Sequence, residues 1–174
     1  MGLFSRFFRK NASDSDSSRT PGAHPTTTAP VPKGIQYDPG LIDILLRDHA
    51  QLGSLYQRIG KAGDSGNPIE LSRLLGQFKL RLESHVIHEN VRFYNYVEQS
   101  MKNDRASVEL MRGFRRDMNA IVREVLDFVK KHQAAAASSG IHPDFAADYT
   151  HVLHALELRL DSEENSLYPL YKPH

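Results

Sequence analysis

The sequence predicts an all-α protein: an up-down-up-down antiparallel four-helix bundle that follows a disordered N-terminal arm. Three observations lead to this prediction. From Leu41 onward, helix-breaking stretches fall at 62–67, 103–104 and 138–143 and divide the chain into four segments. The segments that these stretches separate carry apolar residues at alternating steps of three and four, and no convincing strand interrupts them. Short connections between long helices favour antiparallel neighbours.

The predicted arm comprises residues 1–36. Its first ten residues, MGLFSRFFRK, mix phenylalanine with arginine and lysine, and the following stretch is rich in Ser, Thr, Pro and Gly. Such a stretch buries little apolar surface and is typical of a flexible linker. The tip lacks the long apolar core of a signal peptide. We expect residues 1–10 either to contact a membrane surface or a partner protein, or to be no more than a frayed terminus.

Composition restricts the function of the bundle, which is predicted over residues 37–174. The 174-residue chain has 40% hydrophobic and 25% charged residues, a formal net charge of +1 and no cysteine. Disulfides, thiolate nucleophiles and cysteine-based metal sites are therefore excluded. No basic groove with interleaved aromatics indicates a nucleic-acid partner. A cytoplasmic location is the simplest expectation, with membrane association through the tip as a variant of it.

The four helices are predicted at about 40–61, 68–101, 105–136 and 143–170. Each carries one inward-facing seam, as the core of a bundle requires. The seams are Ile42, Leu45, His49, Leu52, Tyr56 and Ile59; Leu75, Phe78, Leu82, His85, Glu89 and Arg92 or Phe93; Met111, Phe114, Met118, Ile121, Val125 and Phe128; and Leu153, Leu156, Leu160, Glu163, Leu167 and Leu170.

Four of these seam residues are ionisable: His49, His85, Glu89 and Glu163. A carboxylate in an apolar core is costly unless another group compensates for its lost hydration. Two carboxylates and two imidazoles that converge inside a bundle have the composition of a metal site. This combination suits iron, manganese or zinc.

The second and fourth helices contain an internal repeat. His85-x-x-x-Glu89 is followed by Phe93-Tyr94, and Arg159-x-x-x-Glu163 is followed by Leu167-Tyr168. Residues four apart lie on one helical face, so both members of each pair point toward one centre. Four tyrosines are expected to pack at the bundle ends, where phenol groups reach water: Tyr94, Tyr96, Tyr168 and Tyr171. Glu164 is expected to face solvent.

The chain resembles the hemerythrin-like, HHE cation-binding family over about residues 40–170. The resemblance rests on three motifs: LLRDH at 45–49, HVIHE at 85–89 and SEENSLYP at 162–169. It implies a di-iron centre inside the bundle, with one iron held by histidines of the first two helices and the other by histidines of the last two. Carboxylates of the second and fourth helices bridge the pair. Members of the family bind oxygen, sense oxygen or redox state, handle iron or take part in the repair of nitrosative damage.

Two positions depart from the family pattern. His49, His85, Glu89 and Glu163 fall on ligand positions, but Met118 and Arg159 stand where the family has histidine. A guanidinium has no lone pair for a metal. It can instead pair with Glu163, and with Glu89, so that its charge substitutes for the second cation.

Three functions remain open at this point. The first is a metal-binding protein that holds one or two iron ions, or another divalent metal, and senses or binds O2 or NO or handles iron. The second is a metal-free bundle that serves as an interaction or signalling module. The third is an oxidation enzyme, which needs two metals about 3.5–4 Å apart. The loss of one histidine pair argues against an enzyme.

Overall fold

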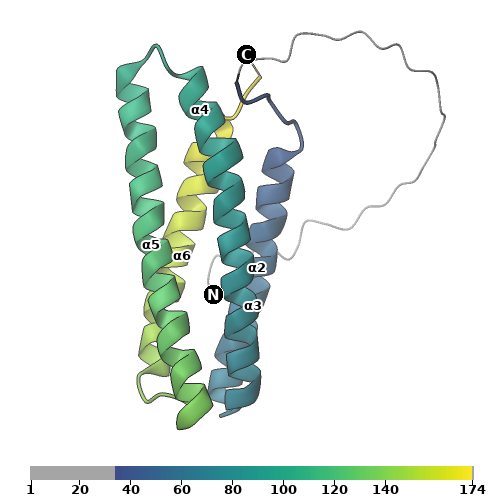
Figure 1. Cartoon of the computed structure of the whole chain (residues 1–174), viewed down its shortest axis with the longest axis vertical. Coiled ribbons are helices and arrows are strands. Elements are labelled where there is room, and N and C mark those ends of the chain that lie inside the picture. The colour runs from purple at the N-terminus through teal and green to yellow at the C-terminus, as the bar shows by residue number, and fades with distance from the viewer. Residues whose placement is uncertain (1–33, 174) are drawn as a thin grey trace, which may run out of the picture.

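The computed structural model describes residues 34–173, and these form four long antiparallel helices and no strand (Figure 1). The elements are α2 (Leu41–Asp64), α3 (Pro68–His88) with its continuation η1 (Glu89–Tyr94) and α4 (Asn95–Ser100), α5 (Arg105–Ser138), and α6 (Phe145–Ser162) with its continuation η2 (Glu163–Leu167) and η3 (Tyr168–Leu170). The predicted fold class is confirmed. Most of the predicted arm, with its tip at 1–10, lies outside the described residues.

Two of the long helices, α3 and α5, begin at the predicted breakers because side chains there cap them. The Asn67 side chain accepts a hydrogen bond from the Glu70 amide at 3.1 Å, and Pro68 occupies the first turn of α3. Asp104 caps α5 in the same way, through the amides of Ala106 and Ser107. The predicted helix limits therefore lie close to the observed ones.

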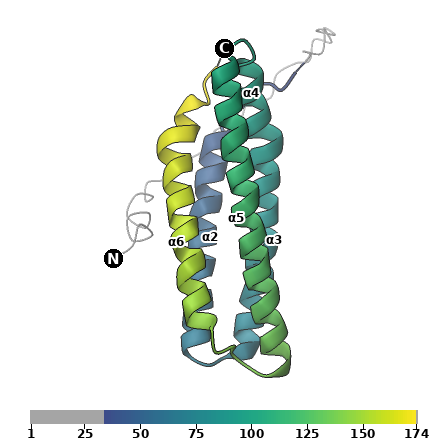
Figure 2. The ribbon, with the colours of Figure 1, turned by 90° about the vertical axis from the view of Figure 1, so that its left-hand side faces the viewer.

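The four helices surround one long core. Each helix contacts the next in the order α2, α3, α5, α6, and α6 closes the ring against α2 (Figure 2). Successive helices run in opposite directions, so the N-terminal end of α2 lies beside the C-terminal end of α6. None of the described helices is long and apolar enough to cross a lipid bilayer.

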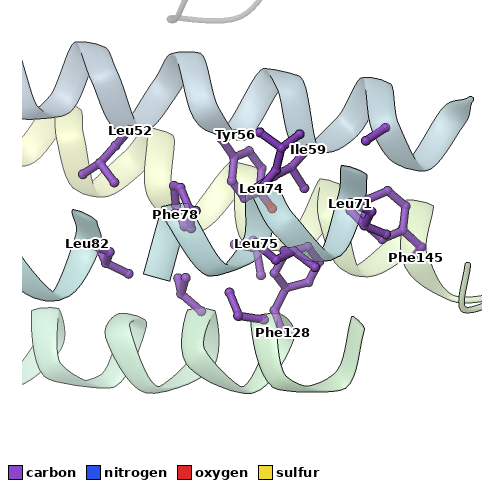
Figure 3. Packing of buried hydrophobic residues seen from close by; sticks show 14 residues of the cluster. Leu52, Tyr56, Ile59, Leu71, Leu74, Leu75, Phe78, Leu82, Phe128 and Phe145 are labelled. Carbon is purple, nitrogen blue, oxygen red and sulfur yellow. The ribbon is translucent and has the colours of Figure 1, made fainter. Parts of the chain in front are cut away.

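The apolar core is divided into two clusters. One fills the half of the bundle near the α2–α3 connection and includes Leu52, Phe78, Leu82 and Phe128 (Figure 3). The other fills the opposite half and is largely aromatic, with members Leu41, Leu45, Phe93, Tyr94, Tyr96, Val97, Met111, Leu167, Tyr168 and Tyr171. Five buried polar residues of the described chain lie along the helices between these clusters: His49, His85, Glu89, Arg159 and Glu163. His132 is also buried, and it packs against Phe128 and Phe145 of the first cluster.

The predicted seam of the fourth helix is partly wrong. Glu163 and Leu167 are buried as predicted, but Leu153, Leu156 and Leu160 are only half-buried. The fully buried residues of α6 upstream of Glu163 are Phe145, Val152 and Arg159. Residues 152, 159 and 163 follow one another at steps of seven and four, so they lie on one helical face. The buried face therefore contains residues 152 and 159 in place of the predicted 153 and 160, and Arg159 lies in the core.

Two π-helical segments were not predicted. η1 begins at Glu89 and η2 begins at Glu163, so the wide turns start at equivalent residues of the internal repeat. In an α-helix, residues five apart point about 140° away from each other. A π turn closes its hydrogen bonds between residues five apart and brings such residues onto one face. Glu89 and Tyr94 are therefore both buried, as are Glu163 and Tyr168.

Candidate metal centre

The bundle brings the predicted ligands together from three of its four helices. His49 of α2, His85 of α3 and Glu163 of η2 are buried, and one ligand atom of each lies within 4.8 Å of the others. His49 Nε2 is 3.2 Å from His85 Nε2 and 3.2 Å from Glu163 Oε2. Glu89 lies at the edge of this group, with its Oε2 3.8 Å from His85 Nε2.

The outer nitrogen of each imidazole faces a carboxylate. His49 Nδ1 lies 2.8 Å from Glu164 Oε1, whereas His85 Nδ1 lies 3.8 Å from Asp48 Oδ2, an ion-pair distance beyond hydrogen-bond reach. A carboxylate beside Nδ1 favours a proton on that nitrogen and leaves the Nε2 lone pair directed at the centre, as in many metal sites. The expectation that Glu164 faces solvent is wrong, because the π turn at Glu163 directs both glutamates toward His49.

Arg159 occupies the other half of the centre. It is 6% exposed, and its Nε donates a hydrogen bond to Glu163 Oε1. One terminal nitrogen donates to the Tyr94 hydroxyl, and the other donates to the carbonyl of Phe114 at 3.3 Å. Glu163 is thus shared: Oε1 binds the guanidinium and Oε2 faces His49. Glu89, the other predicted partner of Arg159, accepts a hydrogen bond from Tyr168 instead.

The expectation that tyrosines of the bundle ends reach water is wrong for the two tyrosines of the repeat. Tyr94 and Tyr168 are buried, and their hydroxyl groups reach the polar centre. The Tyr168 hydroxyl lies 3.1 Å from His49 Nε2 and donates to Glu89 Oε1 at 3.0 Å. The repeat at Phe93-Tyr94 and Leu167-Tyr168 was a sequence signal for this pair, but α-helical spacing placed the hydroxyls away from the centre.

A cavity of about 30 Å³ adjoins the group. Met118 of α5 and Arg159 line it together with His49, His85 and Glu163, and the remaining wall is apolar. A volume of this size holds about one or two water-sized molecules. The Met118 side chain is buried. It occupies one of the two positions where the family pattern has a histidine ligand.

Burial and charge perturb the protonation of the centre. Burial alone would lower the pKa of His49, but hydrogen bonds to Glu163 and Glu164 outweigh it and raise that pKa to about 9. Burial, together with the charge of Glu163, raises the pKa of Glu89 to about 8. Burial lowers the pKa of His85. Without a metal at neutral pH, His49 is therefore an imidazolium between two carboxylates, and Glu89 is protonated.

These shifts predict that the stability of the metal-free protein falls as pH rises from 7 to 9.5. Both groups have a higher pKa in the folded state than in the unfolded state, so their stabilising effect is complete at low pH and is lost as pH passes through about 8 for Glu89 and about 9 for His49. We expect the melting temperature of the chelator-treated protein to drop by roughly 5 °C or more over this window. A melting temperature that stays level or rises would contradict the assignment, and His49→Gln should flatten the curve.

The residues of the centre fit a metal ion. Glu89 Oε2 has no hydrogen-bond partner among the described residues although it is buried. The two Nε2 atoms face each other at 3.2 Å, so a metal ion that displaces the proton of His49 can be bound by both lone pairs. Nitrogen and carboxylate donors in this ratio suit iron, manganese and zinc.

A comparison with family models agrees with this geometry. The model described as Hemerythrin HHE cation binding domain matches residues 40–171. The chain belongs to this family. Proteins with a hemerythrin HHE domain bind metal ions, commonly iron. Searches of curated proteins and of solved structures gave no match. Metal binding by His49, His85, Glu89 and Glu163 themselves stays a prediction.

Proposed function

We propose that this hemerythrin HHE protein binds a single metal ion, iron by preference, through His49, His85, Glu89 and Glu163. The observation that carries the proposal is the opposed pair of Nε2 atoms, each with a carboxylate beside its Nδ1. This arrangement aims two lone pairs at one point. Glu163 Oε2 and the unpartnered Glu89 Oε2 add two anionic donors.

Arg159 supports one ion rather than two. Its guanidinium binds the Glu163 oxygen that would otherwise be free to bridge to a second ion. Like a metal, it carries a fixed positive charge, but it has no lone pair and no exchangeable coordination position. Met118 offers only a thioether, which suits softer metals. The centre is therefore half metal site and half buried ion pair.

The proposed role is in sensing or binding O2 or NO, or in iron handling. The four protein donors leave coordination positions free on an iron ion, which typically accepts more ligands than four. The adjoining cavity of about 30 Å³ has room for a diatomic molecule such as O2 or NO. Addition of NO to the anaerobic ferrous protein should change its visible and electron paramagnetic resonance spectra if the cavity opens onto the ion.

Metal analysis of the purified full chain tests the proposal. Protein expressed in iron-supplemented medium, or loaded anaerobically with Fe(II) and desalted, should retain one iron per chain. His85→Ala should retain none, because it removes a donor from the buried group. His151→Ala is a matched control, since His151 is 75% exposed, forms an ion pair with Glu124 and lies outside the buried group. Trace metal in the wild type, or equal metal in His85→Ala, would refute the proposal.

One observation favours a second candidate, a metal-free bundle that acts as an interaction or signalling module. His49 with a raised pKa and Arg159 together supply two positive charges for the buried carboxylates, so the centre is compensated without a metal. This candidate predicts a wild-type protein that retains no iron, manganese or zinc under the same loading conditions. It also predicts that added Fe(II) leaves the melting temperature unchanged.

A further inference from the structure

The internal repeat places two tyrosines at equivalent positions of the centre. Tyr94 follows Glu89 by five residues, and Tyr168 follows Glu163 by five residues, each at the end of or just after a π segment. Each tyrosine reaches across to the other hairpin. Tyr94 contacts Arg159 of α6, while Tyr168 contacts His49 of α2 and Glu89 of η1.

Tyr94 shows how a tyrosine at this position of the repeat contacts a neighbouring cation. Its hydroxyl oxygen accepts a hydrogen bond from the Arg159 guanidinium, and Arg159 stands where the family pattern has a histidine ligand of the second ion. By the symmetry of the repeat, the Tyr168 oxygen faces the position of the first ion. Its distance of 3.1 Å from His49 Nε2 matches the 3.2 Å that separates His49 Nε2 from both His85 and Glu163. Ligand atoms on one metal with bonds of about 2.0–2.2 Å lie about 2.9–3.5 Å apart.

We propose that Tyr168 is a further ligand of the metal and binds it as a phenolate, which makes the centre selective for ferric iron. The inference rests on the proposed metal site, and it adds a ligand that hemerythrin-type His and Glu donors do not provide. An anionic oxygen is a hard donor and stabilises Fe(III) over Fe(II). On coordination, the O–H bond of Tyr168 breaks, the oxygen binds the ion, and the proton leaves to solvent.

Charge balance in the buried centre favours the same assignment. Once a metal ion has displaced the protons of Glu89 and His49, Glu89, Glu163 and Arg159 together contribute one net negative charge. A ferrous ion with a neutral Tyr168 and a ferric ion with an ionised Tyr168 then leave the same total charge in the core. Oxidation that is matched by loss of the phenol proton adds no uncompensated charge to a site of low dielectric, where such a charge is costly. The stacked ring of His49, 5.6 Å from the Tyr168 ring between centroids, holds the phenol in this orientation.

Iron loading and oxidation of the full chain test the proposal. The protein is loaded anaerobically with one equivalent of Fe(II), oxidised with one equivalent of ferricyanide and desalted, and its iron content and visible spectrum are recorded. We expect a phenolate-to-Fe(III) charge-transfer band that disappears on reduction with dithionite. Tyr168→Phe should lose the band at unchanged iron content, because it removes only one oxygen. Tyr94→Phe is the matched control and should keep the band.

Three results would overturn the proposal. The first is a ferric wild type with one iron per chain and no such band, which leaves the metal site standing and removes the tyrosine ligand. The second is a Tyr168→Phe variant that keeps both iron and band. The third is a wild type that binds no iron, which removes the metal site as well. Should Tyr168→Phe fail to fold, resonance Raman spectra of wild type labelled with ring-deuterated tyrosine decide the question, since the vibrations of a bound phenolate must shift and unshifted vibrations would exclude it.

Discussion

Replacement of Arg159 by alanine is expected to destabilise the metal-free protein by about 3–5 kcal/mol. The guanidinium is 6% exposed and is hydrogen-bonded to Glu163, Tyr94 and the Phe114 carbonyl. Its removal leaves the Glu163 carboxylate buried with one oxygen unpaired. The free-energy cost of this unpaired charge is larger than the net stabilisation that the intact ion pair provides. The melting temperature should fall by about 10–20 °C for a domain of this size.

Two matched variants separate this effect from a general loss of side-chain packing. Arg73→Ala removes an arginine from an exposed pair with Glu70 and should change stability by less than about 1 kcal/mol. The double variant Arg159→Ala with Glu163→Ala should be less destabilised than the sum of the two single variants, because no charge is left without its partner. Chemical denaturation of chelator-treated proteins measures all four. A stability for Arg159→Ala within about 1 kcal/mol of wild type would show that Glu163 does not depend on the guanidinium.

The fold and the burial of the candidate ligands were predictable because they depend on α-helical periodicity and on turn chemistry. Steps of three and four place His49 and His85 on inward faces, and Asn67 and Asp104 mark the helix starts where they cap them. The pairing of Arg159 with Glu163 follows from the same spacing. For these residues, the local pattern and the final structure agree, so the sequence alone was sufficient.

The inner contacts of the centre were not predictable because they depend on the π segments. The wide turns at Glu89 and Glu163 rotate the following residues relative to an α-helix and bring Tyr94, Tyr168 and Glu164 to the polar group. A regular α-helix, which turns by about 100° per residue, would place these side chains at the surface or at the bundle ends. In the second and fourth helices alike, a glutamate is followed five residues later by a tyrosine. This spacing predicts that both residues of a pair are buried only if a π turn lies between them.

Introduction of histidine at positions 118 and 159, where the family pattern has it, is expected to raise the iron content from one to two ions per chain. Met118 and Arg159 line the same cavity as His49, His85 and Glu163, so imidazoles at both positions would face the vacated half of the centre. The double variant Met118→His with Arg159→His also releases Glu163 Oε1 from the guanidinium. Both carboxylates, Glu89 and Glu163, then become free to bridge two ions, as the family pattern implies.

The single variants are the controls for this prediction. Met118→His keeps the Arg159 cation at the second position and should still bind one iron, whereas Arg159→His alone supplies one imidazole without the other and should bind a second ion weakly. Only the double variant should show the near-ultraviolet and visible absorption of an oxo-bridged diferric pair after oxidation. If it folds and binds one ion, the second half of the centre was lost through more than two substitutions. If it binds two, the charge of Arg159 and the thioether of Met118 are what restrict the natural protein to one, and Tyr94, which contacts the guanidinium in the natural chain, would face the second ion as Tyr168 faces the first.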